Sequence, residues 1–104
     1  MTETEFNQQV DAVLMKIEAA LDASGADIDY ETTAGILTLE FADSSKIIIN
    51  RQGATQEIWV AAKSGGFHYR WDGVAWRNTR DGSELFAALS GFIGRQAGIG
   101  ISLG

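Results

Sequence analysis

The hydrophobic residues in the first part of the chain repeat at the spacing of an α-helix. They lie three or four positions apart and form one continuous stripe: Phe6, Val10, Val13, Leu14, Ile17 and Leu21. Such a stripe is typical of a helix that packs one side against a core. Thr2 and Glu5 have the spacing of a capping box, and Ser24 followed by Gly25 is a stop signal. The pattern predicts a helix over residues 3–23.

From residue 27 the hydrophobic period changes to two, which is typical of strands with one buried face. The alternation predicts about six strands in succession, at residues 27–31, 37–41, 46–52, 57–63, 67–71 and 74–77. Turn residues separate them, and Asp72 with Gly73 gives a strong hairpin signal. The helical period returns from Leu85 to about residue 96, with Ser83 as the expected N-cap. We expect residues 97–104 to form a tail packed against the helices.

This order of elements predicts the fold class. A helix at each end of the sequence and an unbroken run of antiparallel strands between them favour an α+β fold. The predicted architecture is a two-layer sandwich in which both terminal helices pack on one face of the sheet. The other face is left to solvent or to a partner. We see no internal repeat or linker, so residues 1–104 are expected to form a single domain.

Composition excludes several classes of function. The chain has 104 residues, no Cys, one His and a formal net charge of -6. Without Cys it has no disulfide and no thiolate site for zinc or an iron–sulfur cluster. The acidic balance argues against binding nucleic acid or an anionic membrane surface. No apolar run approaches the ~20 residues of a membrane span, and the first residues are acidic where a signal peptide would be basic. We expect a small, soluble, cytoplasmic protein.

The negative charge is concentrated in the first part of the chain. Residues 1–43 contain ten carboxylates and one base, Lys16, whereas residues 44–104 contain four carboxylates and seven bases. On a helical wheel Asp11, Glu18 and Asp22 lie within about 40° of one another, beside the hydrophobic stripe. The first helix is therefore expected to have one acidic edge.

The first strand adds a second set of carboxylates. Asp27, Asp29 and Glu31 take its outward phase, because the hydrophobic residues between them need the inward one. If this strand is an edge strand beside the first helix, both sets of acids line a single ridge. Exposed oxygen ligands suit hard cations that are held weakly and keep most of their water. The alternative is an acidic surface that is only solvated.

The outward face of the predicted sheet carries a second candidate site. Asn50, Gln52 and Trp59 take the outward phase of their strands, and an outward Trp exposes apolar area unless something covers it. Aromatic, amide and Arg side chains of this kind are typical of protein interfaces. His68 also takes an outward phase and could serve a partner or a metal, or be an ordinary surface histidine. The alternative for Trp59 is that its own neighbours cover it.

Several motifs together make the sequence similar to a known family. They are residues 35–41 (GILTLEF), 45–52 (SKIIINRQ), 57–63 (EIWVAAK), 65–69 (GGFHY), Trp76 and 96–98 (QAG). With the acidic first helix, these motifs span nearly the whole chain. The sequence resembles the frataxin family, specifically its bacterial CyaY branch. The Asn-Arg-Gln step followed by an Ile-Trp strand is the most specific part of the resemblance.

The resemblance implies a non-catalytic, iron-binding accessory protein of iron–sulfur cluster assembly. It implies weak binding of Fe²⁺ or Fe³⁺, or of other divalent cations, by an acidic ridge; the candidate ligands are Glu18, Asp22, Asp27, Asp29 and Glu31, with Asp11 and Asp43. It also implies binding to the cysteine desulfurase and the scaffold protein; the candidate residues are Asn50, Arg51, Gln52, Trp59 and His68. We expect a monomer, with iron-induced oligomers as an alternative. Two other functions stay open: a ferroxidase that stores iron, and an acidic interaction module that uses no metal.

Overall fold

The computed structural model describes residues 1–101 and 103. Within these residues the chain forms two helices and six strands, in the order α1 (Glu3–Ser24), β1 (Ile28–Thr33), β2 (Ile36–Phe41), β3 (Lys46–Gln52), β4 (Glu57–Ala62), β5 (Gly65–Trp71), β6 (Trp76–Asn78) and α2 (Leu85–Ala97). All strand pairs are antiparallel, and the strands lie side by side in sequence order, so β1 and β6 are the two edges.

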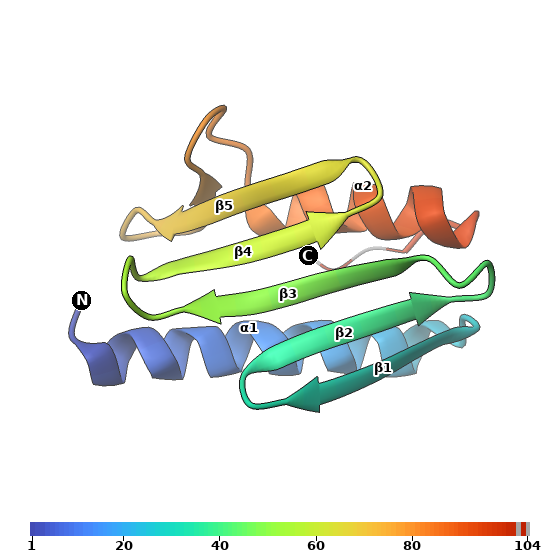
Figure 1. The fold of residues 1–104 in the computed structure, drawn as a ribbon, viewed down its shortest axis with the longest axis horizontal. Coiled ribbons are helices and arrows are strands. Elements are labelled where there is room, and N and C mark those ends of the chain that lie inside the picture. Colours follow the sequence, from blue (N-terminus) through green and yellow to red (C-terminus); the bar gives the residue numbers. More distant parts are fainter. Residues whose placement is uncertain (102, 104) are drawn as a thin grey trace.

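Both helices cover the same face of the sheet (Figure 1). Helix α1 runs behind β2 and its neighbours, and α2 runs behind β4 and β5. In the described part of the chain no helix covers the other face, which we call the outer face. The predicted two-layer α+β sandwich is confirmed. The side chains of each strand alternate between the helix side and the outer face, so the sequence phase of a residue decides which surface it joins.

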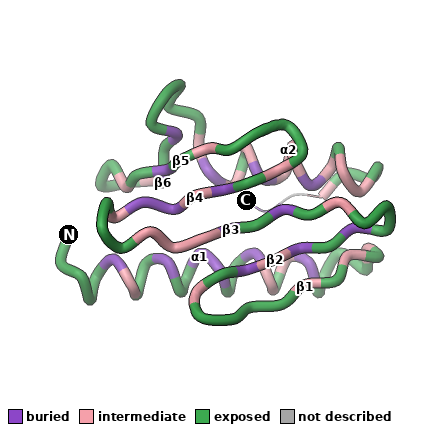
Figure 2. The backbone as a smooth tube through the Cα atoms, viewed as in Figure 1, coloured by how far each residue is buried: buried purple, intermediate pink, exposed green. Residues whose placement is uncertain are grey.

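The hydrophobic core lies between the helices and the sheet. Buried positions recur along both helices and alternate with exposed ones along the middle strands (Figure 2). The core includes the whole predicted stripe of α1 and the inward residues of the strands: Leu37, Leu39, Phe41, Ile47, Ile49, Ile58, Val60, Tyr69 and Trp76. Burial of each large apolar side chain is worth about 1.5–3 kcal/mol, so this layer supplies most of the stability of the sandwich.

Helix α1 begins at the predicted residue and ends at Ser24, one residue beyond the predicted end. The Thr2 hydroxyl accepts the Glu5 N–H at 3.1 Å, and the Glu5 carboxylate accepts the Thr2 N–H at 3.0 Å. This capping box satisfies two backbone donors that would otherwise lack partners. Gly25 ends the helix in the left-handed conformation, with φ of 67°.

The start of α2 differs from the prediction. Glu84, not Ser83, is the N-cap, and its carboxylate accepts the N–H groups of Phe86 at 2.8 Å and Ala87 at 3.0 Å. The N–H and the hydroxyl of Ser83 both donate to Asp81, at 2.9 and 2.6 Å, which holds Ser83 in the preceding loop. The helix itself begins at Leu85, where the helical period was predicted to return, so only the N-cap lies one residue later than predicted.

The last strand also starts later than predicted. The Asp72 carboxylate accepts the N–H groups of Val74 and Ala75, both at 2.8 Å, which holds these two residues in the loop. Val74 is 82% exposed, and β6 begins only at Trp76. The predicted strand 74–77 is thus replaced by Trp76–Asn78.

The tail after α2 packs back onto that helix where the structure describes it. Leu103 is 3% exposed, and its N–H donates to the Ser90 hydroxyl at 3.1 Å. Positions 102 and 104 of the predicted tail 97–104 lie outside the described residues. The described part agrees with a tail packed against the helices.

Candidate functional site: an acidic edge and the outer sheet face

The carboxylates of α1 lie beside the edge strand β1, as the sequence predicted. The Tyr30 hydroxyl donates to Asp22 at 2.8 Å, and the Thr32 hydroxyl donates to Glu18. Tyr30 and Thr32 take the helix-facing phase of β1, so these two hydrogen bonds join the strand to α1. The bond to Asp22 raises the pKa of Tyr30, because loss of the Tyr30 proton would break the bond and leave two negative charges side by side.

The carboxylates of β1 lie on the other side of the same edge. Asp29 and Glu31 take the opposite phase from Tyr30 and are exposed, and Asp27 is exposed just before the strand. Asp29 is directly opposite Glu40 of β2 in the strand register. Sequence analysis did not place Glu40 in the site, because only the register shows which residue of β2 faces Asp29.

We call Glu18, Asp22, Asp27, Asp29 and Glu31 together the acidic edge. Its members gather along β1 but are divided between the two faces of the sheet. Among the described residues, no group of three or more His, Asp or Glu side chains is close enough together to hold one metal ion. The arrangement can attract cations by summed charge, but it offers no chelating cage.

The structure separates two predicted metal ligands from the acidic edge. Asp11 pairs with Arg51 of β3, and Asp43 pairs with Lys63 at 3.2 Å. Hydrogen bonds from Ser45, together with the Lys63 ammonium, lower the pKa of Asp43 to about 2. Both carboxylates already have a cationic partner in the chain, so they are poorer candidates for a metal than the five residues of the acidic edge.

On the outer face, three predicted partner-binding residues form one row across the strands. Asn50 of β3 is opposite Trp59 of β4, which is opposite His68 of β5. The Trp59 and His68 rings are stacked, with centroids 4.3 Å apart and planes 7° from parallel. Gln52 is opposite Glu57 in the neighbouring row. Trp59 is half-buried and points outward, as its phase predicted.

Beside this row lies a buried carboxylate that sequence analysis missed. Glu57 is only 6% exposed although it belongs to the outer face. Its carboxylate accepts hydrogen bonds from Trp59 Nε1 at 2.9 Å, Thr55 Oγ1 at 3.1 Å and Arg70 Nη2 at 2.9 Å. The bond from Trp59 is the largest reason that the pKa of Glu57 is lowered in spite of its burial. A sequence signal existed, because Glu57 is the sole acid between Asp43 and Asp72.

Arg51 does not join the outer face. It follows Asn50 in β3 and therefore points to the helix side, where Nη1 donates to Asn7 at 2.9 Å and Nη2 pairs with Asp11. Gly35 of the β1–β2 turn lies against its side chain. Arg51 thus connects β3 to α1, and the structure places it apart from the other four predicted partner-binding residues.

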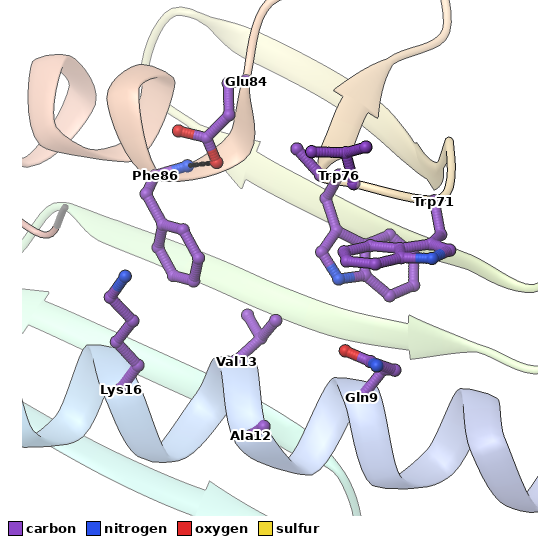
Figure 3. A pocket seen from close by; sticks show the side chains of 10 residues that line it. Gln9, Ala12, Val13, Lys16, Trp71, Trp76, Glu84 and Phe86 are labelled. Atoms are coloured by element: carbon purple, nitrogen blue, oxygen red, sulfur yellow. Dashed lines mark hydrogen bonds between the residues drawn. The ribbon is translucent and has the colours of Figure 1, made fainter.

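A groove lies between the first turn of α2, the middle of α1 and the β5–β6 hairpin (Figure 3). Its volume is about 480 Å³, and its walls are mainly apolar, with Val13 on one side and the Trp71 and Trp76 rings on the other. The Lys16 ammonium lies 4.2 Å from the centre of the Phe86 ring. Trp76 is buried and Trp71 is half-buried, as expected for core and hairpin packing. The groove brings together no nucleophile, acid and base.

No helix in the described part of the chain is long and apolar enough to cross a membrane.

Comparison with known proteins identifies the family. The family model described as a frataxin-like domain matches residues 1–99. The chain belongs to the frataxin family. The resemblance to the CyaY branch is confirmed by relatives that carry the CyaY name.

Two of these relatives match over nearly their whole length. The iron-sulfur cluster assembly protein CyaY of Dechloromonas aromatica (strain RCB) is 52% identical over 104 residues, which is 99% of this chain and 99% of the relative. The protein of the same name from Cupriavidus necator is 48% identical over 108 residues, covering 100% of this chain and 97% of the relative.

Solved structures agree with the fold. Frataxin from Psychromonas ingrahamii, described as a model for stability modulation within the CyaY protein family, superposes with a TM-score of 0.94 at 36% sequence identity. That comparison covers 100% of this chain and 99% of the other. Yeast frataxin superposes with a TM-score of 0.67 at 25% identity, over 89% of this chain and 77% of the other.

Proposed function

We propose that this chain is an accessory protein of iron–sulfur cluster assembly. The observation that carries the proposal is its full-length similarity, at 52% identity, to a relative that bears this function in its name. The similarity extends over 99% of both chains, so it includes the acidic edge, the outer face and the core that supports them. The acidic edge then serves both iron and the first approach to the assembly proteins, and the outer face contacts those proteins.

The acidic edge binds Fe²⁺ or Fe³⁺ weakly, as cargo or signal. Its ligands are carboxylates, four of them exposed and Glu18 half-buried, and such oxygen ligands suit hard cations and also admit other divalent ions. Because the carboxylates are divided between two sides of β1, each ion contacts few of them and keeps most of its water. This geometry supports binding that is weak and readily reversed, in contrast to a resident metal centre.

The same edge brings the protein to a basic surface of the cysteine desulfurase. Ten carboxylates against one base in residues 1–43 give this end of the molecule a strong negative potential. Such complementarity raises the association rate and makes it fall steeply with salt. The outer face then contacts the desulfurase and scaffold complex through the row Asn50, Trp59 and His68 and the neighbouring Gln52. Iron and the desulfurase compete for the same carboxylates or share them.

The protein acts as a regulator or iron supplier and not as an enzyme. Ferroxidase centres combine inward-facing carboxylates with His on packed helices. Here the one His, His68, lies on the outer face, and the carboxylates of the acidic edge are exposed except for Glu18, which is half-buried. Oxygen uptake during Fe²⁺ addition tests this point, and sustained turnover above the protein-free rate would favour the ferroxidase alternative.

One observation favours a second candidate function, an acidic interaction module that uses no metal. Two members of the acidic edge, Glu18 and Asp22, already accept hydrogen bonds from β1 hydroxyl groups. No three-ligand group exists among the described residues. In this case the carboxylates serve docking alone, and iron leaves the affinity for the desulfurase unchanged.

Calorimetry with iron separates the two candidates. The triple variant Asp22→Asn/Asp27→Asn/Asp29→Asn removes three charges from the acidic edge and is expected to lose most of the iron-binding heat. The matched control Glu3→Gln/Asp72→Asn/Asp81→Asn removes three charges elsewhere, and the two new Asn side chains can still accept the loop hydrogen bonds. Equal iron binding by wild type and the first variant would contradict the assignment to the acidic edge.

A further inference from the structure

Glu57 is a buried carboxylate on the outer face of the sheet. Burial of a charge is unfavourable unless hydrogen bonds replace the lost water. Three side chains of the outer face provide these bonds: Trp59 and Thr55 donate to Oε1, and Arg70 donates to Oε2. His68 Nδ1 lies 3.8 Å from the same Oε1. One carboxylate therefore contacts or approaches four of its neighbours on the outer face.

This arrangement fixes the Trp59 ring from two directions. Residues 57 and 59 are next neighbours on the same face of β4, which brings the carboxylate within reach of the indole N–H. That hydrogen bond, 2.9 Å long, sets the rotation of the indole ring about its bond to Cβ. The flat side of the ring then stacks on His68, the cross-strand partner of Trp59.

We propose that Glu57 is a positioning residue, which holds the Trp59 and His68 rings in one orientation before the assembly complex binds. This inference rests on the proposed role of the outer face in binding the desulfurase and scaffold. A ring that is free to rotate must be ordered during association, which weakens binding by about two- to tenfold for each side chain. Because Glu57 orders the rings before association, this weakening of binding is avoided. Its own negative charge is neutralised by Arg70 and is buried, so the partner does not contact it.

The effect is separate from the stability of the fold. The side chains of Glu57, Trp59, His68 and Arg70 lie on the outer face, whereas the core residues of β4 point to the helices. Arg70 is 63% exposed, so its ion pair with Glu57 adds little stability. A substitution at Glu57 changes the order of the two rings and leaves the layer between sheet and helices intact.

The test compares Glu57→Leu with two matched variants. Glu57→Leu removes every acceptor, Glu57→Gln keeps one oxygen for the indole N–H, and Thr55→Val removes a different donor to the same oxygen. Nuclear Overhauser contacts between the Trp59 and His68 rings, and the exchange rate of the Trp59 indole proton with water, report ring order. Surface-based kinetics with purified desulfurase and scaffold report affinity.

For Glu57→Leu we expect loss of the ring contacts, faster indole exchange and binding about two- to tenfold weaker for each freed ring. Glu57→Gln should show a smaller loss, and Thr55→Val should match wild type in both measurements. Ring contacts unchanged in Glu57→Leu, or rings disordered at wild-type affinity, would overturn the inference. If Glu57→Leu fails to fold, the other two variants decide. The inference is overturned if Glu57→Gln has the indole exchange and affinity of wild type while Thr55→Val shows accelerated indole exchange. If wild type does not bind the complex, the proposed function fails, and the ring measurements still decide whether Glu57 positions Trp59.

Discussion

Replacing Gly35 with Ala tests the structural role of Arg51. Gly35 is the second residue of the two-residue turn between β1 and β2, and its φ is 78°. A left-handed backbone costs an ordinary residue about 1–2 kcal/mol. A Cβ at this position would also lie 3.0 Å from Arg51 Nε, closer than carbon and nitrogen can normally approach. The Arg51 side chain must then shift, which weakens its contacts with Asn7 and Asp11.

The two effects add to a large loss of stability. The two hydrogen bonds of Arg51 contribute about 0.5–1.5 kcal/mol each. Together with the backbone term, their loss is expected to lower the free energy of unfolding of Gly35→Ala by about 2–5 kcal/mol. Gly25→Ala is the matched control. Its φ is 67°, and a Cβ there would meet nothing within 4 Å, so it should lose only the backbone term. The difference between the two variants measures the displacement of Arg51.

Urea unfolding of Gly35→Ala, Gly25→Ala, Arg51→Ala and the double variant Gly35→Ala/Arg51→Ala gives these energies. In the Arg51→Ala background the excess loss caused by Gly35→Ala should disappear, because no guanidinium remains to be displaced. A Gly35→Ala variant no less stable than Gly25→Ala would refute the reasoning, as would an excess that persists without Arg51. Folded Arg51→Ala should also bind the desulfurase complex like wild type, since Arg51 faces α1.

Three further predictions concern single residues. Asp43 has a folded pKa of about 2, below its ordinary 3.8, so its contribution to stability is complete above pH 3.8 and is lost as the pH falls toward 2. Asp43→Asn should therefore flatten this part of a plot of Tm against pH. An unchanged slope would contradict the assignment. Ala34 has a φ of 53°, so Ala34→Gly should raise the free energy of urea unfolding by about 1 kcal/mol, and a loss would argue against a left-handed residue there. Trp59→Ala should weaken binding to the desulfurase complex by about 2 kcal/mol or more. The control Val74→Ala, which truncates an exposed apolar side chain elsewhere, should not weaken it. Equal affinities of Trp59→Ala and wild type would remove Trp59 from the interface.

Local patterns in the sequence were sufficient for most of the fold. The stripe of α1 and its capping box involve residues at most a few positions apart, so their geometry follows from helix spacing alone. The alternation of the strands likewise placed Trp59 and Asn50 outward. Local patterns were insufficient where two neighbouring polar residues could each be the N-cap of a helix, as at Ser83 and Glu84. Which of them caps α2 depends on the hydrogen bonds that Ser83 makes to Asp81 in the loop.

The candidate site likewise has features that follow from the sequence and features that depend on the tertiary structure. The sequence by itself determined that the first part of the chain is acidic, that β1 and α1 each carry carboxylates, and that an indole projects from the sheet. Only the tertiary structure decided which charges are neutralised and which side chains meet. Asp11 meets Arg51 across 40 positions, and Glu57 meets Arg70 across 13. Such contacts depend on strand register and on how the helix packs against the sheet, and a periodic pattern carries information about neither.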